Sequence, residues 1–311
     1  MILLVTGAGG FLGRALVRSV LEREPASRVI GLDPGPPPPG LPAHFAWERG
    51  SAADSALVER LIRSHTVDAV AHLARAPETT ELGPLMREHL GFTLAVCHAV
   101  QRAGGVRRVL VPGSAAEYGL FPESELPIPE DRVPHPAGAY GYAKLAECSL
   151  ALQAPAKLGV PAFVARVFNP VGPGQGTRFV CGSLAAQFAR MRATGVAPLR
   201  LGPLTPQRDF IDVSDAAEAL RLLLGRARPG EAYNVGTGRG TRVADVLEVF
   251  QELTGLRPPP GAPAPPAASH EAAEHSVADI GKLRAATGFE PRVALRDSLR
   301  AMLEAAVAGQ A

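Results

Sequence analysis

Short apolar runs alternate with longer stretches of helical spacing through the first half of the chain. The apolar runs have the length and composition of buried strands and lie at residues 2–6, 28–33, 68–74 and 107–114. The helical stretches between them lie at residues 11–24, 56–64 and 85–103. This alternation predicts a parallel, doubly wound sheet with helices on both faces, and ligands bind such sheets at the carboxyl ends of the strands.

The pattern loosens in the second half. Residues 161–169 and 233–238 predict further strands, and helical spacing recurs at residues 183–194, 214–224, 242–255 and 294–306. A proline-rich run at residues 257–269 predicts an extended surface connection, because its prolines exclude a helix. The later segments therefore predict a second, smaller domain that is interleaved with the first.

The composition is that of an ordinary soluble globular protein. The 311 residues are 46% hydrophobic and 20% charged, with a formal net charge of +2. Scattered charges of both signs disfavour a nucleic-acid partner, and no apolar segment reaches the roughly 20 residues that a membrane-spanning helix needs. Cys97, Cys148 and Cys181 lie far apart without CxxC spacing, which favours a reducing cytoplasm and disfavours a structural metal site.

A glycine-rich turn follows the first predicted strand. The segment TGAGGFLG at residues 6–13 has its glycines at GxxGxxG spacing and leads into the first predicted helix. Without Cβ atoms the backbone can turn tightly and approach a pyrophosphate, whose charge the amides at the helix start would face. The cofactor contacts predicted here are Gly7, Gly10, Phe11, Leu12 and Gly13.

An acidic residue supports that interpretation over a purely structural turn. Asp33 ends the second predicted strand, about 20 residues after the glycines. A carboxylate at this point accepts hydrogen bonds from ribose hydroxyls and repels a 2′-phosphate. The two features together predict a dinucleotide site that prefers NAD, with NADH as the reduced form and NADPH as a possible substitute.

Three further residues predict proton-handling chemistry. Tyr140 and Lys144 lie four apart in the segment 139–147, so they share a face if this segment is helical. A nearby ammonium stabilises a phenolate over a phenol, and lysine also suits hydrogen bonds to ribose hydroxyls. Ser114 ends a predicted strand, where its hydroxyl can bind a substrate carbonyl. The alternatives are a solvent-facing YxxxK pair and an ordinary turn serine.

Motifs that run nearly end to end extend this set: TGAGGFLG, HLA at 72–74, GSAAEYG at 113–119, YGYAK, RVFNPVGPGQ at 166–175, RDFIDVSD at 208–215, YNVGTG and DIGKLRAATGFEP at 279–291. Through them the chain resembles an extended short-chain dehydrogenase/reductase of the NAD-dependent epimerase/dehydratase family, which acts on nucleotide sugars. The combination of GSAAEYG, FNPVGPGQ followed by RFV, and LGPLTPQRDFIDV is most similar to the GDP-4-keto-6-deoxymannose reductases.

The resemblance implies an α/β fold with a Rossmann-type doubly wound parallel sheet and a smaller interleaved substrate-binding α/β domain. The dinucleotide-binding domain would comprise residues 1–167 and 207–238, and the nucleotide-sugar-binding domain residues 168–206 and 239–311. A homodimer would form through the helices at residues 85–103 and 140–158.

The resemblance also implies roles for individual residues. Catalysis would fall to Ser114, Tyr140 and Lys144. Besides the glycine turn and Asp33, the cofactor would contact Ser51, Leu73, Ala74, Arg75, Tyr140, Lys144 and Phe168. The sugar nucleotide would contact Ser114, Glu117, Asn169, Phe179 and Arg208. Arg208 is a suitable phosphate clamp, because its planar guanidinium offers several donors; an ion pair with Asp209 or Asp212 is the alternative.

The sequence departs from the family pattern at several positions. Ser51 stands where relatives commonly have an aspartate that contacts adenine, with Asp54 as the nearest acid. Arg75 stands where alanine is usual and His89 where asparagine is frequent. The segment 268–276 offers Ser269, His270 and His275 but no arginine for the diphosphate.

Three reactions use the same serine, tyrosine and lysine. A 4,6-dehydratase needs acidic groups directly after the serine, where this chain has Ala115 and Ala116, and Glu117 follows one position late. This pattern disfavours a dehydratase. The resemblance carried by FNPVGPGQ followed by RFV and by LGPLTPQRDFIDV favours reduction of the 4-keto group of an NDP-4-keto-6-deoxyhexose, with Tyr140 as proton donor. The alternatives are an NDP-sugar 4-epimerase with tightly bound NAD and a non-catalytic dinucleotide-binding sensor.

Overall fold

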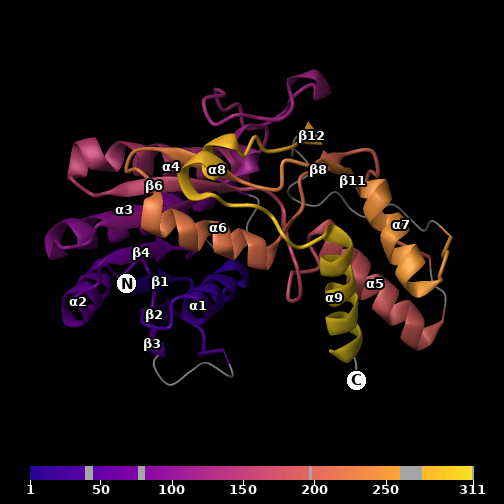
Figure 1. Ribbon diagram of the computed structural model, residues 1–311, viewed down its shortest axis with the longest axis horizontal. Helices are drawn as coiled ribbons and strands as arrows, with labels where there is room; N and C mark the ends of the chain where they lie inside the picture. The colour runs from indigo at the N-terminus through magenta and orange to yellow at the C-terminus, as the bar shows by residue number, and fades with distance from the viewer. Residues whose placement is uncertain (39–44, 76–80, 196–197, 260–274, 310–311) are drawn as a thin grey trace.

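Seven parallel strands form the central sheet of the protein, which we describe from a computed structural model (Figure 1). The described residues are 1–38, 45–75, 81–195, 198–259 and 275–309. The strands are β1 (Ile2–Thr6), β2 (Arg28–Asp33), β3 (Phe45–Arg49), β4 (Ala69–His72), β5 (Arg108–Ser114), β6 (Ala162–Val167) and β10 (Ala232–Val235). Their order is β10-β6-β5-β4-β1-β2-β3, and every pairing is parallel. The predicted doubly wound parallel sheet is confirmed.

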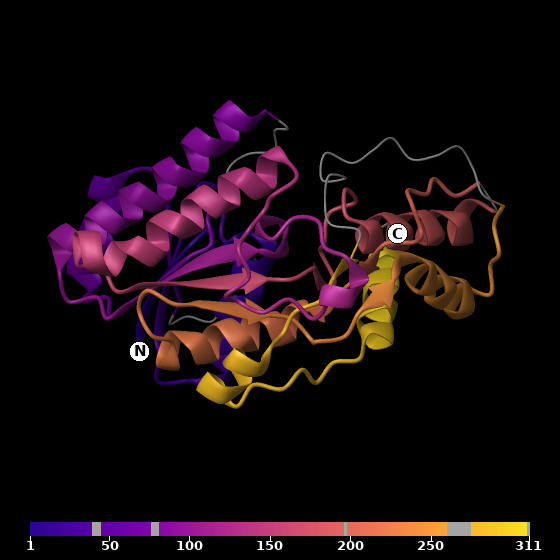
Figure 2. The ribbon, with the colours of Figure 1, turned by 90° about the horizontal axis from the view of Figure 1, so that it is seen from above.

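Helices cover both faces of this sheet, as Figure 2 shows. One face carries α1 (Phe11–Arg23) and α6 (Val213–Arg226), which pack against each other through Leu16, Val20 and Leu220. The other face carries α2 (Ser55–His65), α3 (Leu82–Ala103) and α4 (Ala139–Leu158). Because both faces are covered, the central strands are mostly apolar and do not alternate with exposed polar positions, and β4 and β6 are buried along their whole length.

A smaller part of the molecule lies beside the sheet, at the right of Figure 1. Its helices are α5 (Val180–Thr194), α7 (Val243–Thr254) and α9 (Leu295–Ala308). They share a separate apolar cluster in which the rings of Phe188 and Phe250 stack with centroids 5.7 Å apart. The helix α8 (Gly281–Thr287) packs back on α6 and β10, with Leu283 and Phe289 in the core of the sheet.

Several short elements have no counterpart in the apolar pattern. The strand β3 extends the sheet beyond β2 and was not predicted. Two small sheets join β7 (Pro170–Val171) to β9 (Ile211–Asp212), and β11 (Thr241–Arg242) to β8 (Gln207–Arg208) and β12 (His275–Ser276). Two-residue strands form through pairing between distant segments, so a local pattern cannot predict them. Most of the predicted proline-rich connection lies outside the described residues.

A buried carboxylate joins these short sheets to the large one. Asp209 follows β8, is fully buried, and accepts hydrogen bonds from the amide of Thr237 at 2.8 Å and its hydroxyl at 2.6 Å. It also accepts from the amides of Gly238 at 2.9 Å and Ala278 at 3.2 Å. These four donors offset part of the cost of burying one charge, and burial still raises the pKa of Asp209 above its usual value. Among the described helices, none is long and apolar enough to cross a membrane.

Candidate active site

The carboxyl ends of four neighbouring strands meet at one edge of the sheet, and two of the predicted residues, Asp33 and Ser114, lie there. Parallel pairing places Thr6, Asp33, His72 and Ser114, the last residues of β1, β2, β4 and β5, at one edge of the sheet. The strand order reverses at β1, which pairs with β2 on one side and β4 on the other. Such a reversal is where doubly wound sheets bind ligands. A 2.8 Å hydrogen bond between Thr6 Oγ1 and His72 Nδ1 ties the two central strand ends together.

The glycine turn at this edge is packed too closely for side chains. Gly7 has a φ of +70°, and a Cβ on it would lie 2.5 Å from the backbone nitrogen of Ala74. A Cβ on Gly13 would lie 2.2 Å from the carbonyl oxygen of Gly7. The backbone of Leu73 and Ala74, which was predicted to contact the cofactor, therefore lies directly against the turn. The start of α1 carries no side-chain cap, so its first amides can bind an anion.

Asp33 lies against the same turn. Its carboxylate accepts from the amide of Gly9 at 3.0 Å and from that of Gly35 at 2.9 Å, and the residue is partly exposed. This carboxylate and the bare helix start form the donor and acceptor set that a dinucleotide requires, so the residues fit such a cofactor. Ser51 is exposed nearby, and Asp54 caps α2 by accepting from the amide of Leu57 at 2.9 Å.

Ser114 is fixed by a tight turn. The chain bends directly after it into the 3-10 helix η1 (Ala115–Glu117) and does not continue as an extended strand. Its hydroxyl oxygen accepts from the amide of Ala116 at 3.2 Å, and its own amide donates to Glu117 Oε1 at 2.7 Å. Because the hydroxyl oxygen is the acceptor here, the hydroxyl proton can be donated to a carbonyl oxygen.

Glu117 does not face the predicted sugar pocket. The residue is fully buried, and Oε2 accepts from Arg166 Nε at 2.9 Å, while Oε1 also accepts from the thiol of Cys148 at 3.2 Å. Arg166 in turn donates to the hydroxyl of Tyr118 at 2.8 Å. The predicted contact of Glu117 with substrate is therefore wrong in this geometry. The buried Glu117 carboxylate neutralises the Arg166 guanidinium. It also holds the turn after Ser114, because it accepts from the Ser114 amide.

Tyr140 is brought to this turn by a glycine beside it. A Cβ on Gly141 would lie 2.5 Å from the carbonyl oxygen of Ala116, so the first turn of α4 packs directly on η1. Tyr140 remains 39% exposed at that point, and its ring lies edge-on to His89 with centroids 6.0 Å apart. Ser114 and Tyr140, which belong to separate elements of the sequence, thus lie on adjoining turns.

Lys144 lies one turn after Tyr140 on the same helix. It is only 4% exposed, and its ammonium donates to Glu147 Oε2 at 2.7 Å. Burial alone would lower the pKa of Lys144, but the Glu147 carboxylate and the Tyr140 phenol outweigh it and raise the pKa above its usual value. Burial alone would raise the pKa of Glu147, but the nearby Lys144 ammonium outweighs it and lowers the pKa of Glu147 to about 2. Sequence reasoning missed Glu147, although an acid three positions after a lysine on one helix is a usable signal.

The remaining residues that were predicted to contact cofactor or substrate differ in their exposure to solvent. Phe168 is fully buried with its ring centroid 6.3 Å from that of Tyr118, so its side chain belongs to the core and does not face a cofactor site. Asn169 donates to the carbonyl of Asp209 at 3.1 Å. Phe179, just before α5, is exposed and lies 4.5 Å from the guanidinium of Arg178. Arg208 in β8 is partly buried, and Arg75 is exposed.

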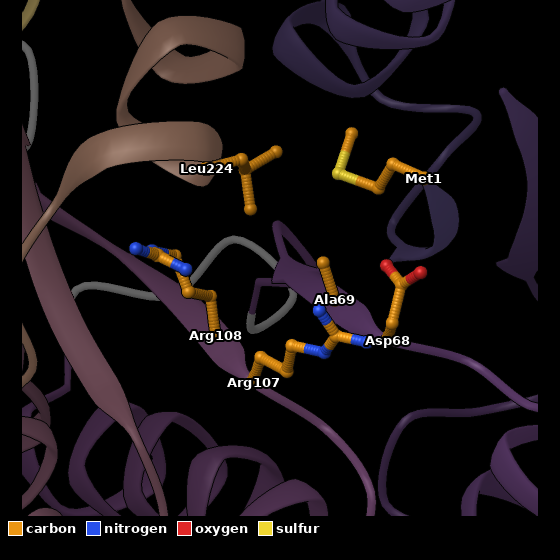
Figure 3. Close-up of a pocket in the computed structure, with 6 residues that line it drawn as sticks. All are labelled: Met1, Asp68, Ala69, Arg107, Arg108 and Leu224. Atoms are coloured by element: carbon orange, nitrogen blue, oxygen red, sulfur yellow. The ribbon is translucent and has the colours of Figure 1, made fainter.

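A hollow of about 300 Å³ lies at the opposite edge of the sheet (Figure 3). It is lined by Met1, Asp68, Ala69, Arg107, Arg108 and Leu224. Most of these residues precede or begin β1, β4 and β5, so this hollow is separate from the candidate site at the carboxyl ends. Among the described side chains, no group of three histidines, cysteines and acids is placed to hold a metal ion.

The reversal of strand order at β1, the glycine turn and Asp33 define a Rossmann-type nucleotide-binding protein. More specifically, residues 3–236 match the model of the NAD dependent epimerase/dehydratase family, and the chain belongs to that family. It is thus an enzyme of the extended short-chain dehydrogenase/reductase type with a nicotinamide dinucleotide cofactor.

Individual relatives cover most of the chain. GDP-6-deoxy-D-mannose reductase of Pseudomonas aeruginosa is 34% identical over 242 residues, which span 76% of this chain and 79% of that protein. The structure of UDP-glucose 4-epimerase from Thermus thermophilus in complex with NAD matches with a TM-score of 0.85 at 27% identity, covering 98% of this chain and 99% of that one. The structure of RMD from Pseudomonas aeruginosa complexed with NADPH has a TM-score of 0.82 at 28% identity and covers 99% of each chain.

The buried pair of Glu117 and Arg166 predicts a large stability effect. Replacing Glu117→Gln should lower the free energy of unfolding by about 3–5 kcal/mol, because Arg166 would remain buried without its counter-charge. Urea unfolding monitored by circular dichroism measures the loss. The matched control is Glu218→Gln, which removes a partly exposed partner of Arg221 and should cost about 1 kcal/mol or less. Equal losses in the two variants would contradict the structural role of Glu117.

Proposed function

We propose that this enzyme reduces the 4-keto group of an NDP-4-keto-6-deoxyhexose, with a nicotinamide dinucleotide as hydride donor and Tyr140 as proton donor. The observation that carries the proposal is the packing of Gly141 on Ala116, which places Tyr140 beside the turn that fixes Ser114. The similarity to a GDP-6-deoxy-D-mannose reductase supports the choice of a 4-keto sugar nucleotide.

The chain's own groups supply the steps around the hydride transfer. Ser114 donates a hydrogen bond from its hydroxyl to the keto oxygen and keeps its proton, which polarises the carbonyl and stabilises the alkoxide that develops. Tyr140 gives its phenolic proton to that oxygen. The ammonium of Lys144 stabilises the resulting phenolate and binds the ribose hydroxyls. When bound, the reduced cofactor supplies the hydride.

The remaining residues of the candidate site are assigned to the cofactor or to the sugar nucleotide. We assign the phosphates to the amides at the start of α1 and the adenosine ribose to Asp33, with a preference for NADH over NADPH. Asn169, Phe179 and Arg208 are assigned to the sugar nucleotide, since they lie in or beside segments that join the sheet to the smaller part of the molecule. The domain boundaries given above remain part of this proposal.

The assembly and location are proposed as well. We place the enzyme in the cytoplasm as a homodimer formed by α3 and α4. These helices pack against each other on one face of the sheet, and Leu94 and Tyr142 are exposed on their outer sides.

A 4-epimerase with retained NAD is the second candidate. It is supported by the similarity to a UDP-glucose 4-epimerase in complex with NAD. Both reactions move a hydride at the sugar C4 and use the same serine, tyrosine and lysine. They differ in whether oxidised cofactor leaves after each turnover.

The reductase assignment predicts net consumption of NADH. Purified protein incubated anaerobically with GDP-4-keto-6-deoxymannose should oxidise one NADH for each sugar reduced, measured by the loss of nicotinamide absorbance and by chromatography of the sugar nucleotides. The dTDP and UDP 4-keto-6-deoxy sugars serve as parallel substrates that identify the base. Interconversion of C4 epimers such as UDP-glucose and UDP-galactose without net cofactor use would establish the epimerase instead.

The proposed proton donor predicts a selective defect. Tyr140→Phe should lower turnover by roughly 10²–10⁴-fold, because the alkoxide loses its proton source. NADH affinity, measured by fluorescence titration, should change little. Tyr142→Phe is the matched control, since Tyr142 lies exposed on the same helix, and it should retain full turnover. Undiminished activity of Tyr140→Phe would remove Tyr140 from the mechanism.

The carboxylate at the end of β2 predicts the cofactor preference. Asp33→Asn keeps the size of the side chain and one acceptor oxygen but removes the charge that would repel a 2′-phosphate. The preference for NADH over NADPH, taken as the ratio of their dissociation constants, should fall by roughly tenfold or more. Asp297→Asn, at an exposed position on α9, is the control. An unchanged ratio would show that Asp33 does not contact the adenosine ribose.

A further inference from the structure

One buried carboxylate lies between α3 and α4, directly behind the candidate active site. Glu147 is 1% exposed, and its Oε2 accepts from Lys144 Nζ at 2.7 Å and from His89 Nδ1 at 2.9 Å. Its Oε1 accepts from the hydroxyl of Thr93 at 3.1 Å. His89 and Thr93 lie one turn apart on α3, so both helices contribute to the same contact. An ionised carboxylate only accepts hydrogen bonds, and it is here satisfied by three donors.

Other titratable groups surround this contact. Tyr140 and Cys148 face Lys144 from α4, and Glu117 faces Cys148 from η1. His72 lies at the end of β4, where burial lowers its pKa to about 4, so it is neutral at physiological pH. Its Nδ1 is bonded to Thr6, and its Nε2 is buried without a partner among the described residues. Glu147 is therefore the carboxylate in direct contact with the Lys144 ammonium.

Burial alone would remove the charge from Lys144. A lysine enclosed in protein without a counter-charge loses its proton readily, and buried lysines with a pKa of about 5–6 are known. The Glu147 carboxylate reverses this tendency, and the pKa of Lys144 lies above its usual value. Neutral lysine would neither stabilise a phenolate nor donate as strongly to ribose hydroxyls.

We propose that Glu147 is a positioning residue that keeps Lys144 charged and directed toward the cofactor, with Thr93 and His89 holding its carboxylate in place. The same contact reaches Tyr140, because the imidazole bound to Glu147 packs edge-on against the Tyr140 ring. One carboxylate thus fixes both the ammonium and the phenol. This inference rests on the proposed function in one respect, the contact between Lys144 and the cofactor ribose.

The test is the pH dependence of NADH affinity, which requires neither the sugar nor turnover. In the unmodified enzyme, the dissociation constant should stay constant between about pH 6 and 9.5, because Lys144 keeps its proton throughout. In Glu147→Gln, it should increase by roughly tenfold across this range, since the uncompensated ammonium loses its proton and a charge-assisted hydrogen bond as pH rises. Fluorescence titration measures the constants.

Matched variants assign the effect to the charge. Glu147→Asp keeps a carboxylate and should restore a flat profile. Lys144→Met should bind NADH weakly at every pH, and the double variant Glu147→Gln with Lys144→Met should lose the pH dependence of the single variant. Glu218→Gln, which alters a carboxylate on the opposite face of the sheet, should behave as the unmodified enzyme. A purely structural role of Glu147 would lower the melting temperature without changing the profile.

The outcomes separate this inference from the proposed reaction. A flat profile in folded Glu147→Gln overturns the inference. If that variant does not fold, the unmodified enzyme still decides, because an NADH affinity that falls near neutral pH would show that Lys144 is not held charged. The expected profiles together with failure to reduce any 4-keto sugar would support the role of Glu147 and overturn the reductase. Absence of NADH binding in the unmodified enzyme would overturn both.

Discussion

Parallel pairing of the strands is the constraint on which the site depends. A parallel strand must be reached by a crossover, so each connection passes over a face of the sheet and all carboxyl ends meet at one edge. Chain segments as distant as Thr6 and Ser114 are thereby placed at one edge. The glycine turn then allows the connection after β1 to lie against the end of β4, since a Cβ on Gly7 would meet the backbone of Ala74. No antiparallel arrangement would gather these groups on one side.

Three buried carboxylates hold together segments that come from different elements of the fold. Glu117 holds the turn after β5, Glu147 joins α3 to α4, and Asp209 joins the short strands to the turn after β10. Each accepts from at least three donors, which offsets the large cost of burying a charge. The first two also lie directly behind Ser114 and Lys144. The interactions that stabilise the fold here therefore also set the positions of the catalytic groups.

The sequence was informative where local chemistry decides the structure. The apolar runs at residues 2–6 and 28–33 coincide with β1 and β2, because parallel strands covered on both faces are apolar over most of their length. The glycine turn could also be predicted from the sequence, because the close backbone contacts at Gly7 and Gly13 leave no room for a Cβ. Glu117 was misassigned because the partner that draws it inward, Arg166, lies 49 residues away in the sequence. Glu147 was missed although Lys144 precedes it by three positions on one helix, and its other partners, His89 and Thr93, come from another helix.

The choice of lysine over arginine at position 144 follows from the number of acceptors around it. The chain has three lysines, and arginine supplies its other basic side chains. Arg166 is buried too, but its guanidinium meets Glu117, the hydroxyl of Tyr118 and the carbonyl of Glu130. A five-donor group needs such a set, whereas the hydrogen bond of Lys144 within the described part of the chain goes to one carboxylate. A single nitrogen can satisfy that contact with one proton and still offer two others to the site. An arginine there would bury donors without partners, so the compact ammonium fits where a guanidinium would not.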